Sequence, residues 1–415
     1  MKSKINNNIH PWIWKWHFIG GIISAPIVIT LAITGIIYLF KDDYEAPTKQ
    51  ALNQIEQKTE NRISYQQQWE LAKNEWKKVP SGIVLPKSDD ECTEFISGRF
   101  SHKSNLYIDP YSKKVTGVIN INETDMHKVQ KLHGELLLGS YGTKVVELVA
   151  SWMVVLIITG LFLFWPRGRG LKGFFTVRIN QGKRIIYRDI HALSGFWFSL
   201  LLLLVLAGGL PWTDVFGNNF KWVQEKTNTG FPLTWEGRTL KSNPVGEAMS
   251  LDEVISTASE LKLAGSTIID LPQSPTGVFS IYNETNELSK MKKIHIDQYS
   301  GEILVRHNWS DVGILMKARL WVMAFHQGEF GLWNWYLMIF IATGLLILSV
   351  SAIISYFYRK QLETLEIPKV PDNFSLSIAL IMTIIVLGIL LPLFGLSIVI
   401  IFLLSKLKRK VALQT

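Results

Sequence analysis

The stretch Ile190–Leu210, with the sequence IHALSGFWFSLLLLLVLAGGL, decides the class of this protein. After its histidine it carries almost only apolar side chains, and about 20 such residues suffice for a helix to cross the hydrocarbon core of a bilayer. Comparable apolar runs lie at residues 19–40, 145–165 and 332–358. The sequence therefore predicts a polytopic α-helical membrane protein with four main transmembrane helices.

A fifth apolar stretch, residues 374–405, is interrupted near its middle by Pro392. Proline lacks a backbone N–H and interrupts a helix, so we expect a C-terminal helical hairpin here. The 415-residue chain is 48% hydrophobic with a mean hydropathy of +0.18, and its long polar stretches indicate aqueous domains as well. Segments 41–130 and 213–318 combine amphipathic helical patterns with strand-like alternation, which predicts two extracytoplasmic α+β modules.

Lysine and arginine side chains gather at residues 2–15, 167–188 and 406–410. The positive-inside rule places such segments in the cytoplasm. A hairpin at the end of the chain keeps all three segments on one side, because the number of crossings is then even. We therefore expect a protein of the cytoplasmic (inner) membrane with both termini in the cytoplasm. The net charge of +9 is explained by these segments and implies no nucleic acid partner.

The expected segments follow in a regular order along the chain. The first half consists of a cytoplasmic tail with the first span (1–40), the first module (41–130) and an interfacial segment with the second span (131–166). A basic cytoplasmic loop (167–190) leads to the second half, with the third span (191–212), the second module (213–318) and an interfacial segment with the fourth span (319–358). A cytoplasmic linker (359–373), the hairpin (374–405) and a cytoplasmic tail (406–415) follow.

The two halves resemble each other in sequence, which indicates an internal repeat. The pattern Ile-Asp-x-Tyr-Ser occurs at 108–112 and again at 296–300. A histidine followed by glycine three or four residues later opens the first span and the third. A histidine shortly followed by Gly-Glu precedes the second span and the fourth. The histidines in these matching positions are His17 and His191, and His133 and His326.

Their positions sort the four histidines into two pairs by membrane depth. In the expected topology His17 and His191 lie at the cytoplasmic boundary, and His133 and His326 lie at the external boundary. A single histidine at a membrane boundary is usually an interfacial anchor, but four at repeat-related positions favour a shared role. Neutral imidazoles from two helices can supply both axial positions of a haem iron. We therefore predict two haem b groups, one for each pair.

Small residues near these histidines fit the same prediction, because a planar macrocycle needs helix backbones to approach it closely. Gly20 and Gly21 follow His17 by three and four residues, and Gly195 follows His191 by four, so these glycines share a helix face with their histidine. Thr-Gly pairs end at Gly35, Gly160 and Gly344. Gly35 is 18 residues from His17 and Gly344 is 18 from His326, about 27 Å along a helix. Each helix is thus expected to place a small residue near the opposite haem. Close helix packing is an alternative explanation for these glycines.

Other chemistries find less support in the sequence. The single cysteine, Cys92, cannot form an internal disulfide or a thiolate cluster, which excludes iron–sulfur and zinc–thiolate sites. Nucleotide-binding, protease and nucleophile-elbow motifs are also missing. His127, six residues before His133, is the main rival ligand. The remaining histidines are expected at the surface or in the cytoplasmic tail: His102, His295 and His307, and His10.

The segments around His17, His133 and His191, the Ile-Asp-x-Tyr-Ser strands and the closing Leu391–Ser397 resemble the PepSY-associated transmembrane family. This family includes iron-regulated inner-membrane proteins and ferric-siderophore reductases of the FoxB type. The resemblance covers nearly the whole chain, and His191-Ala-x-x-Gly-Phe-Trp197 is its most specific part. It implies a di-haem membrane reductase that passes electrons from a cytoplasmic or quinol donor to an external ferric siderophore or other ferric chelate. The fourth site departs slightly from the pattern, with Phe325-His326-Gln327-Gly328 in place of Leu-His-Gly.

Two other functions agree with the same sequence features. A permease for an iron chelate or a peptide can use membrane histidines to bind substrate or protons. A non-catalytic PepSY regulator can use its external modules to bind and restrain another protein. The sequence alone leaves these alternatives open, and it names neither the acceptor nor the donor of electrons.

Overall fold

The structure is a computed structural model, and it describes residues 6–55, 58, 61–99, 102–165, 170–359, 367, 369–370 and 374–412. Lys2, Lys4, Arg167 and Arg169, which contribute to the expected topology, lie outside these residues, as does most of the linker 359–373. The chain divides into two compact units. We call residues within 1–39, 130–221 and 322–415 the membrane unit, and those within 40–129 and 222–321 the sheet unit.

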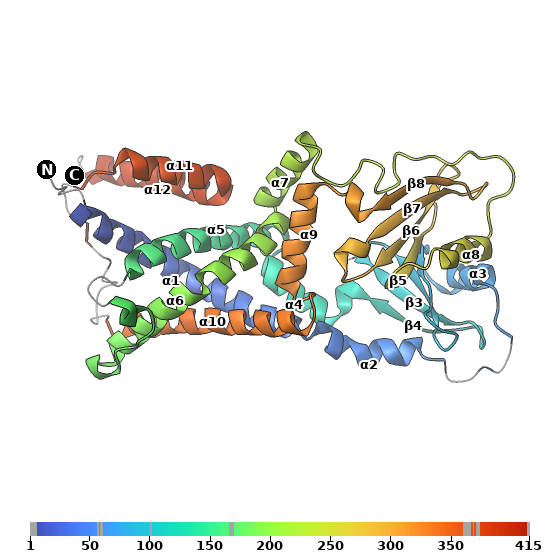
Figure 1. The fold of residues 1–415 in the computed structure, drawn as a ribbon, viewed down its shortest axis with the longest axis horizontal. Coiled ribbons are helices and arrows are strands. Elements are labelled where there is room, and N and C mark those ends of the chain that lie inside the picture. The colour runs from blue at the N-terminus through green and yellow to red at the C-terminus, as the bar shows by residue number, and fades with distance from the viewer. Residues whose placement is uncertain are drawn as a thin grey trace. The chain divides into compact units, whose positions relative to one another are not determined.

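Four long apolar helices form the membrane unit (Figure 1): α1 (Asn6–Tyr38), α5 (Gly139–Phe164), α6 (Lys183–Gly209) and α10 (Leu332–Phe357). Each is long and apolar enough to cross a membrane, which confirms the prediction of four spans. Two of them begin earlier than expected. α1 already includes His10 and His17, and α6 takes in the basic residues from Lys183 onward that the sequence analysis assigned to a loop.

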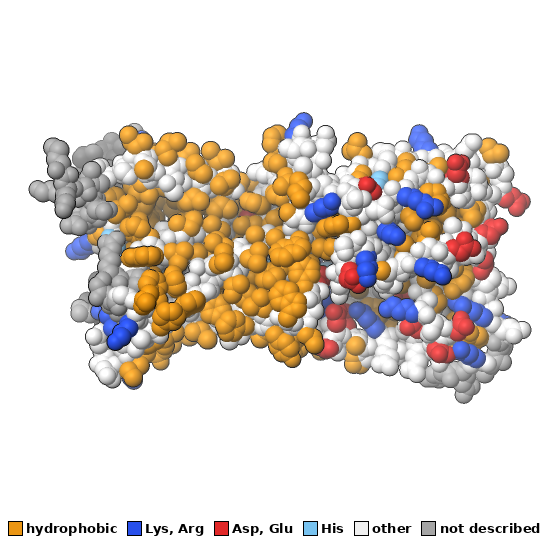
Figure 2. Space-filling model, in the orientation of Figure 1, with side chains coloured by type: hydrophobic (Ala, Val, Ile, Leu, Met, Phe, Trp, Pro, Cys, Tyr) orange, Lys and Arg blue, Asp and Glu red, His pale blue; other side chains and the backbone are white. Residues whose placement is uncertain are grey.

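The exposed surface of the membrane unit explains why these helices need a lipid environment. Large apolar side chains point outward on every span, such as Ile23, Leu200 and Phe340 with 67%, 76% and 59% of their surface exposed. Figure 2 shows hydrophobic side chains covering the helical part of this face, while Lys, Arg, Asp and Glu gather over the sheet unit. A multi-pass membrane protein follows from this distribution.

A pair of C-terminal helices, α11 (Ile378–Leu390) and α12 (Pro392–Ala412), confirms the hairpin predicted around Pro392. The two helices approach closely where Gly388 faces Gly395, since a Cβ on Gly395 would lie 2.6 Å from the Gly388 carbonyl oxygen. α12 packs against α5, where the Trp152 Nε1–H donates to Ser397 Oγ at 3.2 Å.

Short helices precede two of the spans, namely α4 (Asp125–Glu135) before α5 and α9 (Ile314–Gln327) before α10. His133 lies on α4 and His326 on α9, so neither histidine belongs to a membrane-spanning helix. Positive φ angles at Leu136, Leu137 and Gly139 interrupt the helical conformation and separate α4 from α5. The expectation that the second and fourth spans carry a ligand at one end is therefore wrong, and so is the separation of about 27 Å computed for His326 along one helix.

The sheet unit is built on one antiparallel sheet of eight strands in the order β4-β3-β2-β1-β5-β6-β7-β8. The predicted modules each supply four of these strands, and they are joined where β1 pairs with β5. They therefore form one sheet instead of two separate modules. The strands are β1 (Gly82–Val84), β2 (Thr93–Ser97), β3 (Ser104–Asp109), β4 (Lys114–Asn120), β5 (Ser266–Asp270), β6 (Val278–Glu284), β7 (Lys292–Asp297) and β8 (Ile303–Asn308).

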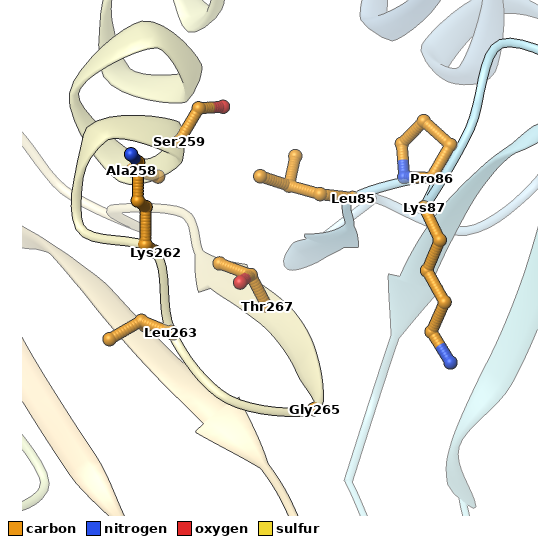
Figure 3. Close-up of a pocket in the computed structure, with 9 residues that line it drawn as sticks. All are labelled: Leu85, Pro86, Lys87, Ala258, Ser259, Lys262, Leu263, Gly265 and Thr267. Atoms are coloured by element: carbon orange, nitrogen blue, oxygen red, sulfur yellow. The ribbon is translucent and has the colours of Figure 1, made fainter.

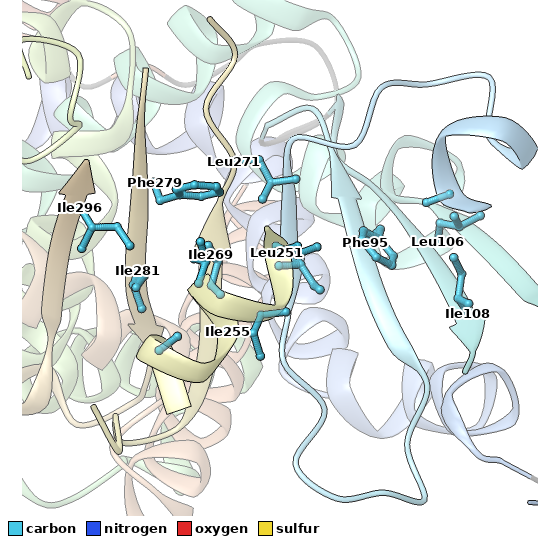
Figure 4. Packing of buried hydrophobic residues seen from close by; sticks show 14 of the residues in the cluster. Phe95, Leu106, Ile108, Leu251, Ile255, Ile269, Leu271, Phe279, Ile281 and Ile296 are labelled. Carbon is cyan, nitrogen blue, oxygen red and sulfur yellow. The ribbon is translucent and has the colours of Figure 1, made fainter. Parts of the chain in front are cut away.

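One face of the sheet is covered by α3 (Tyr65–Glu75) and α8 (Leu251–Glu260), the two amphipathic segments that the sequence predicts as helices. Figure 4 shows the core, to which both halves contribute side chains such as Phe95 and Ile281. Both helices begin with a capping box, at Ser64 and Ser250. The remaining helical elements are α2 (Lys41–Asn53), α7 (Val215–Lys226) and the 3₁₀ turns Ile121–Glu123, Gly170–Phe174, Ile179–Gln181, Leu210–Trp212, Leu288–Lys290 and Trp309–Asp311.

The repeated Ile-Asp-x-Tyr-Ser pattern has a local structural cause. In each copy the aspartate side chain accepts backbone hydrogen bonds from the residues two and three positions later, and this closes the turn between two strands. Asp109 Oδ1 accepts from the Tyr111 N–H at 2.8 Å, and Asp297 Oδ1 accepts from the Tyr299 N–H at 2.8 Å. The pattern is thus a turn signal of the duplicated sheet.

Candidate functional site

The membrane unit brings His17 of α1 and His191 of α6 together, as the sequence analysis predicted. Their ring centres are 6.2 Å apart and the ring planes are inclined by 66°. The Nδ1 atom of His17 lies 2.9 Å from Thr159 Oγ1 on α5, and that of His191 lies 2.9 Å from the Leu348 carbonyl oxygen on α10. All four spans therefore contribute to this histidine pair.

The second histidine pair repeats this geometry with His133 and His326. Their ring centres are 6.1 Å apart and the planes are inclined by 67°. The Nδ1 atom of His133 lies 3.1 Å from Thr34 Oγ1 on α1, and that of His326 lies 3.0 Å from the Val205 carbonyl oxygen on α6. Seventeen residues separate His17 from Thr34 on α1, so the two pairs lie about 26 Å apart along this helix.

These hydrogen bonds determine which ring nitrogen carries the proton. A carbonyl oxygen only accepts, so His191 and His326 must donate from Nδ1. Thr34 and Thr159 each donate their hydroxyl proton to a carbonyl of their own helix at 2.7 Å, which leaves the hydroxyl oxygen to accept from a histidine. In each neutral imidazole the lone pair is then on Nε2. This is the arrangement in which metal-binding histidines are held, with one ring nitrogen anchored and the other free to coordinate.

Glycines provide the room for three of the four rings. A Cβ on Gly160 would lie 3.1 Å from Cε1 of His17, and a Cβ on Gly35 would lie 3.3 Å from Cε1 of His133. On α6, a Cβ on Gly208 would lie 2.7 Å from Cβ of His326. The predicted contact between small residues and the opposite histidine pair is therefore present on α1, α5 and α6.

The fourth span differs from this prediction. Its Thr343-Gly344 does not receive a histidine ring, because the space beside Gly344 is filled by the ring of Phe198. His191 instead reaches Leu348, one helical turn further along α10.

The glycines that share a helix face with a histidine have other neighbours. A Cβ on Gly20 would meet Trp152 at 2.8 Å, which is helix packing, and one on Gly195 would lie 3.6 Å from Leu348. Among the residues that the structure describes, no heavy atom outside the backbone of α1 lies within 4 Å of a Cβ placed on Gly21. Their part in binding a cofactor remains a prediction.

Each histidine pair supplies two ligands and no more. Within the described parts of the chain, no group of three or more His, Cys, Asp or Glu side chains could hold a metal ion. His127 lies on α4 about 9 Å before His133 and turned by about 120° from it, so the ring that faces His326 is that of His133. Of the outer histidines, His102 is exposed as expected.

The expectation of surface positions is wrong for two histidines of the sheet unit. His295 is fully buried and His307 is 6% exposed, with their ring centres 5.8 Å apart. Burial, followed by the nearby Lys293 ammonium, lowers the pKa of His295 to about 4. The Ser280 hydroxyl lies 2.9 Å from Nδ1 of His295. Alternation of polar and apolar residues did not reveal this burial, because five consecutive residues of β7, on both faces of the strand, are buried.

Sequence reasoning also missed two buried acidic residues that connect segments of the membrane unit through hydrogen bonds. Glu147 on α5 is fully buried and accepts the backbone N–H groups of Val215 and Phe216, at 2.8 and 2.9 Å, where α7 begins. Asp189 on α6 is 5% exposed and accepts two hydrogen bonds from the Arg178 guanidinium, at 2.7 and 2.8 Å. A carboxylate inside or next to an apolar run is the signal that could have identified both.

The sheet unit also contains a pocket of about 190 Å³ beside the junction of β1 and β5 (Figure 3). Its lining includes Leu85 and Thr267, where the Leu85 N–H donates to the Thr267 carbonyl oxygen, and also Lys87 and Lys262. None of its lining residues is a histidine, cysteine or carboxylate. The pocket therefore contributes nothing to the chemistry of the histidine pairs.

The fold and the site define a polytopic membrane protein that holds two histidine pairs at two levels of one four-helix bundle. The family model described as the PepSY-associated TM region matches residues 14–359. This match covers most of the 415 residues, so the chain belongs to the PepSY-associated transmembrane family. The comparison with curated proteins found no match.

Proposed function

We propose that this protein is a di-haem transmembrane oxidoreductase that carries electrons across the cytoplasmic membrane to an extracytoplasmic ferric chelate. The observation that carries the proposal is the pair of matching histidine arrangements. In both, the centres of two imidazole rings lie 6.1–6.2 Å apart with planes inclined by 66–67°, and each ring is anchored through Nδ1.

The ring separations fit a metal ion held between two imidazoles on opposite sides. Metal–imidazole bonds of about 2.0–2.1 Å, with about 1.1 Å from Nε2 to the ring centre, put the two centres about 6.3 Å apart. Two protein ligands do not complete the coordination of a transition metal by themselves. A haem, which supplies four ring nitrogens, would need two further ligands, and each histidine pair would offer two.

The residues of this chain would hold such a group at two levels of the membrane unit. When bound, a haem supplies a one-electron ferric/ferrous couple, whose potential depends on its axial ligands and on burial. His17 and His191 would hold the group at one level, and His133 and His326 would hold it at the other. Thr34, Thr159 and the two backbone carbonyls fix the ring orientations, and Gly35 and Gly160 let the helices approach.

The external acceptor and the orientation follow from family resemblance and from the positive-inside rule. The PepSY-associated transmembrane family includes ferric-siderophore reductases. In the reaction of such a reductase, one electron converts bound ferric iron to ferrous iron. We place both termini in the cytoplasm of the inner membrane, so that His133 and His326 lie on the external side. The electron donor on the cytoplasmic side is a soluble reductant or a quinol.

Visible spectroscopy of the purified protein tests the proposal. We expect a Soret band and sharp reduced α and β bands from two b-type haems per chain. The variants His17→Ala and His326→Ala are each expected to lose one haem, because each removes an axial ligand from a different pair. His102→Ala is the matched control, since His102 is exposed in the sheet unit and its variant is expected to keep both haems.

Three outcomes would contradict the proposal or part of it. A colourless protein from haem-replete cells would exclude haem and leave the permease and the regulator as explanations. One haem per chain would refute the two-level arrangement. If both haems are present, reduced protein freed of excess dithionite is expected to be reoxidised by a ferric chelate added to proteoliposomes, and failure with several chelates would exclude ferric reduction.

A further inference from the structure

Phe198 of α6 lies along its helix at a level between the two histidine pairs. It follows His191 by seven residues and precedes Val205 by seven. Seven residues are nearly two full helical turns, so these three residues lie on one face of α6, about 10.5 Å apart along its axis. His191 belongs to the first pair, and the Val205 carbonyl accepts the Nδ1–H of His326 in the second. The phenyl ring thus lies midway along a stripe that links both pairs.

The neighbouring span is shaped to receive this ring. A Cβ on Gly344 of α10 would overlap three carbon atoms of the Phe198 ring. Gly344 lies one turn before Leu348, whose carbonyl oxygen accepts the Nδ1–H of His191. The Phe198 ring also lies 5.0 Å from the ring of Phe340 on α10. The α6–α10 contact therefore holds the ring between the two levels instead of leaving it free to turn into lipid.

This arrangement breaks the internal repeat. The position that corresponds to Phe198 in the first half, seven residues after His17, is Ser24. In the first half the glycine of the Thr-Gly pair on α5, Gly160, receives the His17 ring, whereas in the second half the corresponding Gly344 receives Phe198. Simple helix packing does not require an aromatic ring here, because the duplicated half packs around a serine.

We propose that Phe198 provides the electronic coupling between the two histidine pairs, and that Gly344 keeps its ring in the coupling position. The proposal rests on the di-haem function proposed above. One electron leaves the reduced centre at one pair and reaches the oxidised centre at the other. No bond forms or breaks, and the phenyl ring is neither oxidised nor reduced. The ring shortens the through-space gap for tunnelling, and the tunnelling probability falls steeply as such gaps lengthen.

The test uses full-length protein in proteoliposomes with dithionite added outside, since this anion does not cross the bilayer. The haem on the accessible face is reduced first and the far haem receives its electron through it, so the absorbance rises in two phases. In Phe198→Leu the second phase is expected to slow, with both haems and their midpoint potentials retained. Phe198→Tyr keeps the ring and is expected to restore the rate.

Phe357→Leu is the matched control, because Phe357 lies on α10 beyond Leu348 and is 65% exposed. An unchanged second phase in Phe198→Leu, with two haems present, would overturn the proposal. A wild-type protein without haem would instead refute the underlying function, and the spectrum distinguishes these outcomes before any kinetics.

A second measurement tests the Gly344 part without using electron transfer. Gly344→Ala is expected to lower the unfolding temperature in the wild-type background, because the new methyl group meets the Phe198 ring. In the Phe198→Ala background, Gly344→Ala is expected to lower the unfolding temperature only slightly. Equal effects of Gly344→Ala in both backgrounds would show that the ring does not occupy this space.

Discussion

The Thr34 hydroxyl offers a sharp test of how His133 is held. Thr34 is 3% exposed, donates to the Thr30 carbonyl at 2.7 Å and accepts from His133 Nδ1 at 3.1 Å. In Thr34→Val the side chain keeps its shape but loses the oxygen that anchors the imidazole. The substitution thus removes the bonds of this hydroxyl to carbonyl oxygens of its own helix, and it removes the one bond that anchors the imidazole of His133.

The magnitude of the effect follows from this single bond. A neutral intramolecular hydrogen bond contributes about 0.5–1.5 kcal/mol, and partners that orient a metal-binding histidine are worth about 10–100-fold in affinity. The two ranges overlap near a tenfold change in affinity, which corresponds to about 1.4 kcal/mol of binding free energy. We therefore expect Thr34→Val to weaken haem binding at the His133–His326 pair about tenfold and to leave the other pair unchanged.

The assay is a haem titration of protein prepared without haem, followed by redox titration of the loaded protein. Thr30→Val is the matched control, because Thr30 lies one turn earlier on α1 and its hydroxyl bonds only to the Pro26 carbonyl of its own helix. Equal haem affinities and equal potentials in the two variants would refute the conclusion that the Thr34 hydroxyl holds His133.

Three further predictions concern single residues. Gly160→Leu is expected to lose one of two haems, because its side chain would enter the space of the His17 ring; two retained haems in the pyridine haemochrome assay would contradict this. Glu147→Ala leaves two backbone N–H groups at the start of α7 without their acceptor, which is expected to cost about 2–4 kcal/mol of stability and to lower the thermal unfolding midpoint in detergent, and an unchanged midpoint would argue against it. Burial lowers the pKa of His295 to about 4, so between that pH and about 6.5 the unfolded chain binds one more proton than the folded chain. The free energy of unfolding is therefore expected to decrease by roughly 2–3 kcal/mol as the pH falls through this range. His295→Asn is expected to flatten this pH dependence, whereas His102→Asn is not.

The membrane part of the fold was predictable because its physical cause is local. Apolar runs of spanning length, a proline at 392 and basic segments between the runs are all readable along the chain, and the four spans and the hairpin lie where these signals place them. The internal repeat likewise showed which histidines correspond, because each copy of a duplicated unit repeats the same local pattern.

The sheet unit and its buried histidines were harder to predict. Pairing between β1 and β5 joins segments that are more than 180 residues apart in sequence, and no local pattern reports such a contact. For the same reason the burial of His295 has no mark in the sequence, since what covers this side chain comes from distant parts of the chain.

The histidines at matching depths were thus visible in the sequence itself, because helix periodicity and membrane thickness convert residue spacing into position. Only the tertiary structure decided that the ring centres of each pair lie about 6 Å apart, that Nδ1 is the anchored atom, and that Phe198 fills the space beside Gly344. These features depend on side-chain contacts between helices that are far apart along the chain. A one-dimensional pattern can align residues by depth, but it cannot determine which neighbouring helix each side chain faces.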